Sequence, residues 1–255
     1  MAGTDRGREA LGGGPAIVLV EPQLGENIGT AARAMMNFGL DDLRLVAPRD
    51  GWPNVKAINA AAGATEVIDR MRLYDTTGAA VADRHYVLAT SARPRDLAKP
   101  VLPPRAAAAE MRRRMARGET IGILFGRERT GLDNDDVARA DALIGVPINP
   151  AYGSLNLAQA VLLIGYEWFL TGLDPAAAEA GPPTRRSRLA THGEFENFFA
   201  HLTEELDACG FLRNRAKRPS MLRNIRSLFL RAGLSEQEVR TLHGIVAELV
   251  KGRSR

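Results

Sequence analysis

The chain has 255 residues, 45% of them hydrophobic and 25% charged, which is typical of a soluble globular protein with one large domain and a small extension. No apolar run is long enough to span a membrane, and the first residues lack the apolar core of a secretory signal. The single cysteine, Cys209, excludes an intrachain disulfide. We therefore expect a cytoplasmic protein with no membrane partner. The net charge of +4 arises in the C-terminal part: residues 182–255 hold 14 Lys and Arg against 8 Asp and Glu, whereas residues 1–181 hold 20 against 22. This excess indicates an anionic macromolecular partner, with a solvated basic surface as the alternative.

Strands and helices alternate in the first 171 residues, after a Gly-rich tail at 1–15. Runs of β-branched and aliphatic residues predict short strands at 16–20, 43–47, 86–90, 121–125 and 142–146. Helical patterns follow them at 27–37, 55–62, 75–83, 103–116 and 155–170. Asn27 is placed to cap the first of these helices, and Ser154 the last. The alternation is typical of an α/β domain, here residues 16–171, with a mostly parallel sheet and helices on both faces.

The composition changes after residue 171. Residues 172–190 are rich in Pro, Gly and Ala without apolar periodicity, which predicts a linker. Apolar residues then recur at helical spacing in 193–208, 219–232 and 235–250, and Ser235 with Glu238 matches a capping box at the start of the last segment. We therefore expect a small all-helical extension over residues 191–255.

Three groups of polar residues follow predicted strands. They are Asn27-x-Gly29-x-x-x-Arg33, Gly126-Arg127-Glu128-x-x-Gly131-Leu132 and Asn149-Pro150-x-x-Gly153-Ser154-Leu155-Asn156. Ligands of open α/β sheets bind at the carboxyl ends of the strands, where helix starts also present free N–H groups. On spacing alone an ordinary strand–helix unit explains the stretch 141–170, which holds the third group, equally well. The predicted polar ligand site depends on the three groups taken together.

Several common chemistries lack their motifs. There is no Gly-x-Gly-x-x-Gly after the first strand, no Gly-Lys-Ser/Thr phosphate loop and no Gly-x-Ser-x-Gly turn. The four histidines are scattered without the spacing of metal ligands. Dinucleotide oxidoreduction, P-loop hydrolysis, serine hydrolysis and zinc chemistry are therefore disfavoured, and we expect no metal.

In this order, the three groups resemble motifs 1, 2 and 3 of the SpoU/TrmH class of SPOUT RNA 2′-O-methyltransferases. The segments VLVEPQLGENIGTAARAM, TSAR, GILFGRERTGL and NPAYGSLNLAQAV are most similar to the TrmJ-type tRNA (cytidine/uridine-2′-O)-methyltransferases, and the helical tail is similar to the tail of that subgroup. The resemblance implies a SPOUT fold with a C-terminal trefoil knot, S-adenosylmethionine as cofactor, tRNA as substrate and a homodimer with active sites near its interface. It also implies methylation at nucleotide 32 of the anticodon loop, as cytidine, uridine or both. Ribosomal RNA as acceptor and a catalytically silent RNA-binding protein are the alternatives.

The resemblance also assigns roles to individual residues. The cofactor positions that it implies are Thr90, Ser91, Ala92, Gly126, Val146, Ile148, Gly153, Ser154 and Leu155, although close relatives often have serine at the position of Gly153. The catalytic positions that it implies are Arg33, Ser154, Asn156, Asn27 and Glu128. Because a guanidinium stays protonated, we expect Arg33 to bind phosphate and stabilise a developing alkoxide rather than act as a base, from its own chain or from a partner chain. Glu128 is expected to pair with an arginine and order its loop.

The extension supplies the expected RNA contacts. Residues 210–231 contain many Lys and Arg but no Asp or Glu, and apolar residues lie between the cations. Such an arrangement is suited to a phosphate backbone. We expect RNA contacts at Arg213, Arg215, Lys217, Arg218, Arg223 and Arg226.

Overall fold

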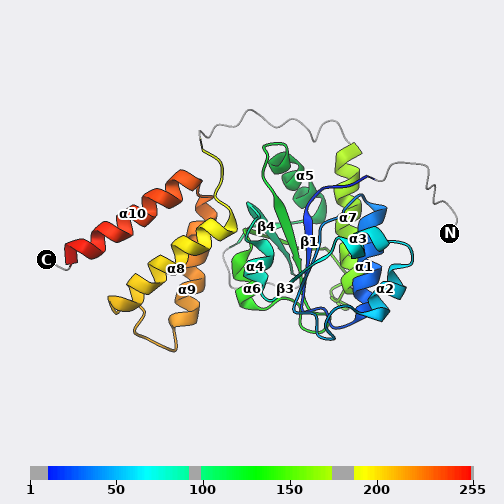
Figure 1. Cartoon of the computed structure of the whole chain (residues 1–255), viewed down its shortest axis with the longest axis horizontal. Helices are drawn as coiled ribbons and strands as arrows, with labels where there is room; N and C mark the ends of the chain where they lie inside the picture. The colour runs from blue at the N-terminus through cyan, green and yellow to red at the C-terminus, as the bar shows by residue number, and fades with distance from the viewer. Residues whose placement is uncertain (1–10, 92–98, 174–186, 254–255) are drawn as a thin grey trace.

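The computed structural model describes residues 11–91, 99–173 and 187–253 (Figure 1). Seven parallel strands form one sheet in this part of the chain, in the order β3-β2-β1-β6-β4-β7-β5. Their bounds are β1 Ala16–Val20, β2 Leu43–Val46, β3 Arg72–Tyr74, β4 Tyr86–Thr90, β5 Val101–Leu102, β6 Ile121–Phe125 and β7 Ala142–Ile144. The five strands expected from the sequence are all present, and the mostly parallel α/β sheet is confirmed.

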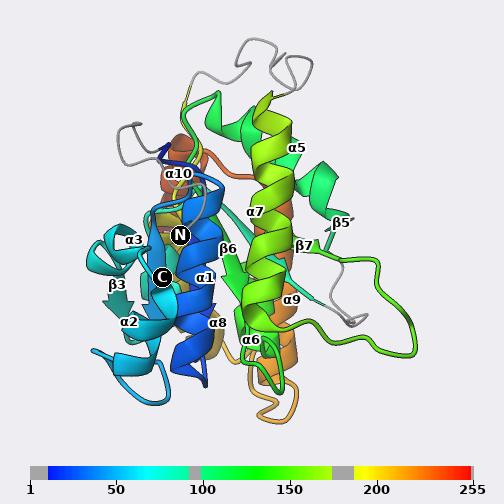
Figure 2. The same ribbon diagram turned by 90° about the vertical axis from the view of Figure 1, so that its right-hand side faces the viewer.

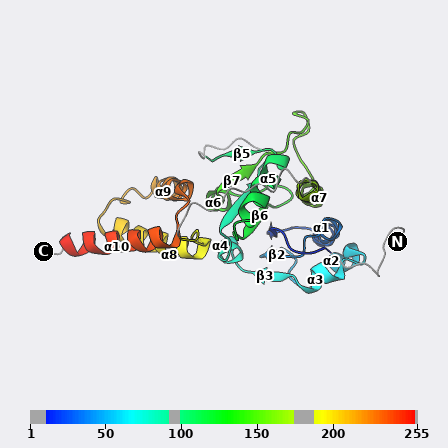
Figure 3. The same ribbon diagram turned by 90° about the horizontal axis from the view of Figure 1, so that it is seen from above.

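The central strands are buried on both faces because helices cover both sides of the sheet (Figure 3). One face packs against α1 Gly25–Asn37, α2 Val55–Ala61, α3 Thr65–Asp69, α5 Pro104–Met115 and α7 Leu157–Leu173. The other packs against α4 Thr77–Val81 and α6 Asn134–Arg139. In β1, for example, Ile17 and Leu19 belong to the first apolar cluster, whereas Val18 and Val20 belong to the second. This two-sided burial is why the strands have continuous aliphatic runs instead of alternating ones.

The glycine of the first motif is required by close packing between α1 and α2. A Cβ atom at Gly29 would lie 2.1 Å from the carbonyl oxygen of Ala57 and 2.7 Å from the amide nitrogen of Ala61. Both contacts are with backbone atoms of α2, which cannot move aside as a flexible side chain can. Gly29 therefore fixes the distance between the two helices that follow β1 and β2.

Two helix starts differ from the prediction. Helix α1 begins at Gly25 and has Leu24 at its N-cap, so Asn27 lies inside its first turn. Helix α7 begins at Leu157, and Asn156 caps it: Asn156 Oδ1 accepts hydrogen bonds from the amides of Ala158 (2.9 Å) and Gln159 (3.3 Å). The expected caps at Asn27 and Ser154 were therefore wrong. In the second case the preference of asparagine for an N-cap equals that of serine, and pattern alone does not separate the two.

Three helices form the extension: α8 His192–Ala208, α9 Arg218–Ala232 and α10 Glu236–Arg253 (Figure 1). They share an apolar core around the buried side chains of Phe195, Phe198 and Phe199. The capping box expected at Ser235 is present, because Glu238 accepts from the Ser235 amide (2.7 Å) and donates its own amide to Ser235 Oγ (3.3 Å). None of the helices in the described ranges combines the length and apolar character needed to cross a bilayer.

The predicted tail and linker lie largely outside the described residues, which begin at Leu11 and omit 174–186. The boundaries set for the α/β domain and the extension therefore stay predictions.

Candidate active site

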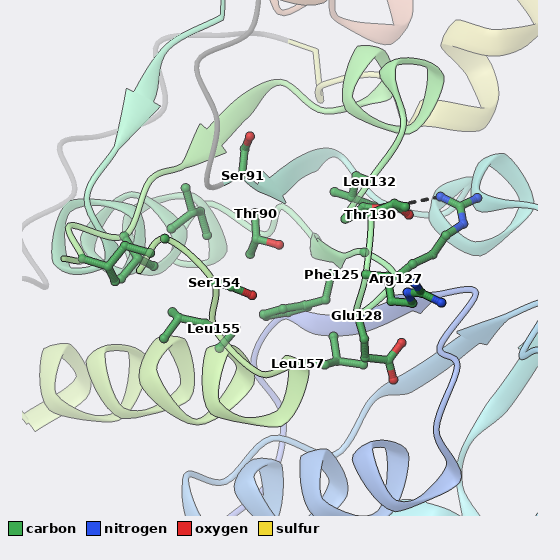
Figure 4. A pocket seen from close by; sticks show the side chains of 18 residues that line it. Thr90, Ser91, Phe125, Arg127, Glu128, Thr130, Leu132, Ser154, Leu155 and Leu157 are labelled. Atoms are coloured by element: carbon green, nitrogen blue, oxygen red, sulfur yellow. Dashed lines mark hydrogen bonds between the residues drawn. The ribbon is translucent and has the colours of Figure 1, made fainter. Parts of the chain in front are cut away.

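A cavity of about 200 Å³ opens at the carboxyl ends of β4, β6 and β7 (Figure 4). Its walls come from the ends of these strands, the loop 126–132 after β6, and the loop and helix start after β7. Apolar side chains such as Phe125, Leu132 and Leu155 alternate with the hydroxyls of Thr90 and Ser154. An apolar cleft with a few polar groups at strand ends is typical of a small-molecule site in a parallel sheet.

Most of the residues expected to bind a cofactor meet in this cavity. Within the described residues its lining includes Thr90, Ser91, Gly126, Val146, Ile148, Gly153, Ser154 and Leu155. The remaining expected residue, Ala92, lies outside the described residues. Lining residues that the sequence analysis did not assign to the cofactor are Phe125, Arg127, Glu128, Arg129, Thr130, Gly131, Leu132, Ile144, Leu157 and Ala160. The sequence could have indicated these residues, because most of them continue the second motif or end strands that were already assigned to the site.

The loop 126–132 folds tightly back on itself. A Cβ atom at Gly126 would lie 2.1 Å from the amide nitrogen of Leu132, so only glycine fits there. Gly131 has a positive φ of 70°, and its amide donates to the Arg127 carbonyl at 2.8 Å. The two glycines of the second motif therefore shape one wall of the cavity rather than contact a phosphate in the manner of a P-loop.

Arg127 anchors this loop at the edge of the cavity. Its Nε donates to Glu21 Oε2 at 2.8 Å, and the carboxylates of Asp133 and Asp136 lie 3.7 Å from its guanidinium. The hydrogen bond to Glu21, the first residue after β1, raises the pKa of the guanidinium. In Figure 4 the Arg127 side chain extends away from Thr90 and Ser154, so it holds the loop instead of filling the cavity.

A chain of hydrogen bonds joins the three motifs. Asn156 Nδ2 donates to Asn27 Oδ1 at 2.9 Å, and Asn27 Nδ2 donates to Glu128 Oε1 at 2.9 Å. The two ends of this hydrogen-bond chain fix the orientation of the asparagine side-chain amides. At one end Asn156 uses its oxygen to cap α7, and at the other the carboxylate of Glu128 can only accept. Residues that are over a hundred positions apart in the sequence therefore lie side by side.

Glu128 also binds the loop that leads into α1. Its carboxylate accepts from the amides of Gln23 (2.8 Å) and Leu24 (3.1 Å), in addition to Asn27. Glu128 therefore holds the loop before α1 through these three N–H groups, and its hydrogen-bond partners in the described residues do not include the arginine that was expected. It connects the loop after β6 to the start of α1.

Arg33 lies apart from the cavity. Its side chain is exposed on α1, and within the described residues it forms no ion pair. Ser154, in contrast, lines the cavity, and Figure 4 shows its side chain near Thr90. The expected catalytic residues thus fall into a connected group (Asn27, Glu128 and Asn156), a cavity residue (Ser154) and an outward-facing cation (Arg33).

The cations expected to bind RNA also divide into two groups. Arg213, Arg215 and Lys217 are exposed in the connection between α8 and α9, and none of them forms an ion pair within the described residues. The others have carboxylate partners: Arg218 with Asp207, Arg223 with Asp135, and Arg226 with Glu196. The three exposed cations are therefore available to bind a phosphate backbone. The three paired arginines already neutralise carboxylates of the protein.

The described residues contain no group of three or more His, Cys, Asp or Glu side chains arranged to hold a metal ion. His201 and His243 are neighbours, with their Nδ1 atoms 3.0 Å apart, although the sequence separates them widely. Such a pair is short of the three or four protein ligands typical of zinc sites.

Replacing Glu128 with glutamine is expected to destabilise the protein by about 1–3 kcal/mol, because N–H donors approach both carboxylate oxygens and the NH2 that replaces one of them cannot accept. Denaturant unfolding of the variant and the wild type measures the difference. The matched control is Glu204→Gln on the exposed side of α8, which should change the free energy of unfolding by less than about 0.5 kcal/mol. Equal stability of Glu128→Gln and the control would contradict the role of Glu128 as a link between loops.

Known proteins match both parts of the chain. Residues 14–166 match the SpoU rRNA Methylase family, and residues 193–255 match the C-terminal domain of tRNA methyltransferase TrmJ. The tRNA (cytidine/uridine/adenosine-2′-O-)-methyltransferase TrmJ of Pseudomonas aeruginosa is 37% identical over 245 residues, covering 92% of this chain and 93% of that protein. The crystal structure of TrmJ from Z. mobilis superposes with a TM-score of 0.83 at 46% identity, covering 92% of this chain and 98% of the other. A probable methylase family protein from Haemophilus influenzae gives a TM-score of 0.60 at 32% identity, with 94% and 97% covered.

Proposed function

The chain belongs to the SpoU family of RNA 2′-O-methyltransferases and has a TrmJ-type C-terminal domain, and we propose that it methylates the ribose 2′-hydroxyl of nucleotide 32 in the tRNA anticodon loop. The methyl donor in this proposal is S-adenosylmethionine, and the nucleotide is cytidine, uridine or both. The observation that carries the proposal is the hydrogen-bond chain Asn156–Asn27–Glu128, which brings all three family motifs together beside one cavity. We place this activity in the cytoplasm, where tRNA is modified.

The residues around the cavity fit the proposed cofactor. Strand-end backbone groups and the hydroxyls of Thr90 and Ser154 can bind a ribose, while Phe125 and Leu155 offer apolar surface to an adenine ring. The close packing of Gly126 against the backbone of Gly131 and Leu132 keeps this wall of the cavity compact. When bound, the cofactor supplies an electrophilic methyl group on a sulfonium.

The order of the strands is compatible with the trefoil knot that the family implies. Strands β6 and β7 lie on either side of β4, so the second and third motifs meet above one strand end. We propose that the chain after β6 threads through a loop of the same domain to reach this position.

We propose residue roles that are consistent with where the side chains lie. Asn27, Glu128 and Asn156 hold the starts of α1 and α7 in fixed positions, and Ser154 orients the ribose. Arg33 stabilises the negative charge that develops on the 2′-oxygen as its proton leaves, and binds the neighbouring phosphate. It does so in a homodimer, from the partner chain.

The surface beside Arg33 suits such a dimer. Helices α1 and α7 pack side by side (Figure 2), and Met36, Leu162 and Tyr166 on them are 40%, 42% and 48% exposed. Leu162 and Tyr166 lie one helical turn apart on α7, and exposed apolar side chains that lie together commonly mark an interface. Two copies that pair through α1 and α7 would bring each outward-facing Arg33 toward the other chain.

We expect S-adenosylmethionine, or its homocysteine product, to bind this protein and NAD not to bind, because the cavity has no glycine fingerprint for a dinucleotide. Titration calorimetry measures both. At about a hundred times its dissociation constant, the ligand should raise the free energy of unfolding by about 2.7 kcal/mol. Binding of NAD without binding of S-adenosylmethionine would refute the assignment.

Mass spectrometry of nucleosides tests the substrate. Purified tRNA and ribosomal RNA are incubated separately with labelled S-adenosylmethionine and the protein. The expected product is a labelled 2′-O-methylated cytidine or uridine in tRNA, and nuclease digestion should locate the label in the fragment that contains position 32. Label in ribosomal RNA alone would show that ribosomal RNA is the acceptor. Label in neither RNA would support the alternative of an RNA-binding protein without catalytic activity.

A further inference from the structure

Among the described residues, the extension and the sheet have separate apolar cores. Two clusters of buried apolar residues flank the sheet, and the third, around Phe195, Phe198 and Phe199, lies within the extension. No cluster of buried apolar residues among those described includes members from both parts. Hydrogen bonds and ion pairs therefore decide how the extension is held on the sheet.

The first turn of α8 is bonded directly to the catalytic domain. The amides of His192 and Gly193 donate to the carbonyls of Arg84 and Ala82, each at 2.8 Å, in the loop between α4 and β4. His192 is 4% exposed, and its Nε2 lies 3.1 Å from Asp141 Oδ2. Two N–H groups at the start of α8 that have no partner within the helix are thus satisfied by the other domain.

Ion pairs extend this contact along α6. Glu196 on α8 accepts from Arg139 on α6 at 3.3 Å and also pairs with Arg226 on α9. The Arg226 side chain is 13% exposed, and its guanidinium lies 4.2 Å from the centre of the Phe199 ring. Arg223 on α9 donates to Asp135 on α6 at 3.2 Å. We call Asp135, Arg139, Glu196, Arg223 and Arg226 the α6 interface.

Helix α6 is also joined to the loop that forms one wall of the cavity. It follows the loop 126–132, and Asp133, which caps it, and Asp136 within it each lie 3.7 Å from the guanidinium of Arg127. Thr77 Oγ1 on α4 donates to Asp136 at 2.6 Å and fixes that carboxylate. One short helix therefore contacts the cavity loop at its start and the extension along its outer side.

We propose that the α6 interface positions the bound RNA: it holds the extension so that Arg213, Arg215 and Lys217 stand at a fixed place relative to the cavity. In this assignment Glu196 is a positioning residue, and Arg223 and Arg226 bind the catalytic domain and α8 instead of phosphate. The inference rests on the proposed tRNA substrate and deepens it. A tethered domain that loses its fixed orientation presents its binding groups at a lower effective concentration, so the KM for tRNA should rise while kcat changes little.

The first experiment compares Glu196→Gln with the control Glu204→Gln, an exposed glutamate on the same helix. Small-angle X-ray scattering of the protein without RNA should give a larger radius of gyration for Glu196→Gln only. Methylation assays should give a KM for tRNA raised about fivefold, the scale of one partly exposed charge pair, with kcat and the affinity for S-adenosylmethionine within about twofold of wild type. Circular dichroism checks that the helices remain folded.

The second experiment exchanges a pair across the interface. Asp135→Arg and Arg223→Asp should each raise the KM for tRNA, and the double variant should restore it, because the ion pair is rebuilt in reverse. If Arg223 bound phosphate, Asp135→Arg would bind tRNA as tightly as wild type or more tightly, and the double variant would stay weak; that result would overturn the proposal.

These readouts separate the proposal from the proposed function. Unchanged scattering together with an unchanged KM in Glu196→Gln would overturn the α6 interface as a positioning device, even if the wild type methylates tRNA. A larger radius of gyration in a protein that methylates no tRNA would support the interface and refute the substrate.

Discussion

Replacing Arg33 with alanine is expected to lower the rate of methyl transfer to tRNA by about a hundredfold or more, with cofactor binding and stability nearly unchanged. Loss of one preorganised group that stabilises developing charge has an effect of this size. Stability should not change, because the side chain is exposed and forms no ion pair within the described residues. Single-turnover kinetics measures the rate. Thermal unfolding without S-adenosylmethionine measures stability, and unfolding in its presence measures cofactor binding.

Two variants control this result. Arg33→Lys should stay nearly as slow as Arg33→Ala, because a point charge cannot reproduce the planar fork that binds a phosphate. Arg117→Ala removes another exposed arginine of the catalytic domain and should keep the wild-type rate. Near-normal turnover in either Arg33 variant would show that this residue is not central.

Mixing experiments decide which chain supplies Arg33. If it acts on the partner's cavity, subunits carrying Arg33→Ala and subunits carrying Ser154→Ala complement each other, because each mixed dimer contains one cavity with both residues. A statistical mixture should then recover about a quarter of the wild-type activity. If Arg33 acts on its own chain's cavity, every mixed dimer has two damaged sites, and the mixture should stay inactive.

Neutralising Arg213, Arg215 and Lys217 together as glutamines is expected to reduce tRNA affinity strongly and to flatten its salt dependence. Each phosphate contact contributes about 0.7–0.9 to the slope of log affinity against log salt, so loss of three contacts should reduce the slope by about 2–3. The loss of affinity should be largest at low salt and similar for different tRNAs, since phosphate contacts carry no sequence information. Filter binding over a range of salt concentrations measures both quantities.

A matched control removes three exposed cations that already have carboxylate partners: Arg70 with Glu66, Arg240 with Glu236, and Lys251 with Glu248. This triple variant changes the net charge by the same amount and should keep nearly the wild-type slope. Equal slopes in the two triple variants would mean that net charge alone attracts the RNA, and the connection between α8 and α9 would then be an ordinary solvated surface.

The sequence predicted the centre of the sheet well and its edges poorly. Strands β1 and β6 are buried on both faces, so their aliphatic runs were clear signals. Strand β3 was missed because it is an edge strand in which Arg72 and Leu73 are exposed, which leaves no hydrophobic pattern to find. Strand β5 has only two residues, too few for any periodicity.

Motif spacing likewise predicted which residues converge on the site but not how they bond. The strand-end rule was enough to bring Asn27, Glu128 and Asn156 together. That Glu128 binds the loop before α1, and that Asn156 caps α7, depends on side-chain distances that only the folded chain sets. In the same way a count of cations cannot separate Arg213, which is exposed, from Arg226, which is paired and largely covered.

The pairing of β1 with β6 also constrains how the chain can fold during translation. Ala16 pairs with Gly122, so β1 gains this neighbour only after about a hundred further residues have been added. At typical rates of synthesis this takes about 5–20 s, during which the edge of β1 that pairs with β6 keeps its backbone N–H and C=O groups without their native partners. Sheets with such long-range parallel contacts also fold slowly after release from the ribosome. Nascent chains of this protein should therefore depend on chaperones until β6 and β7 emerge.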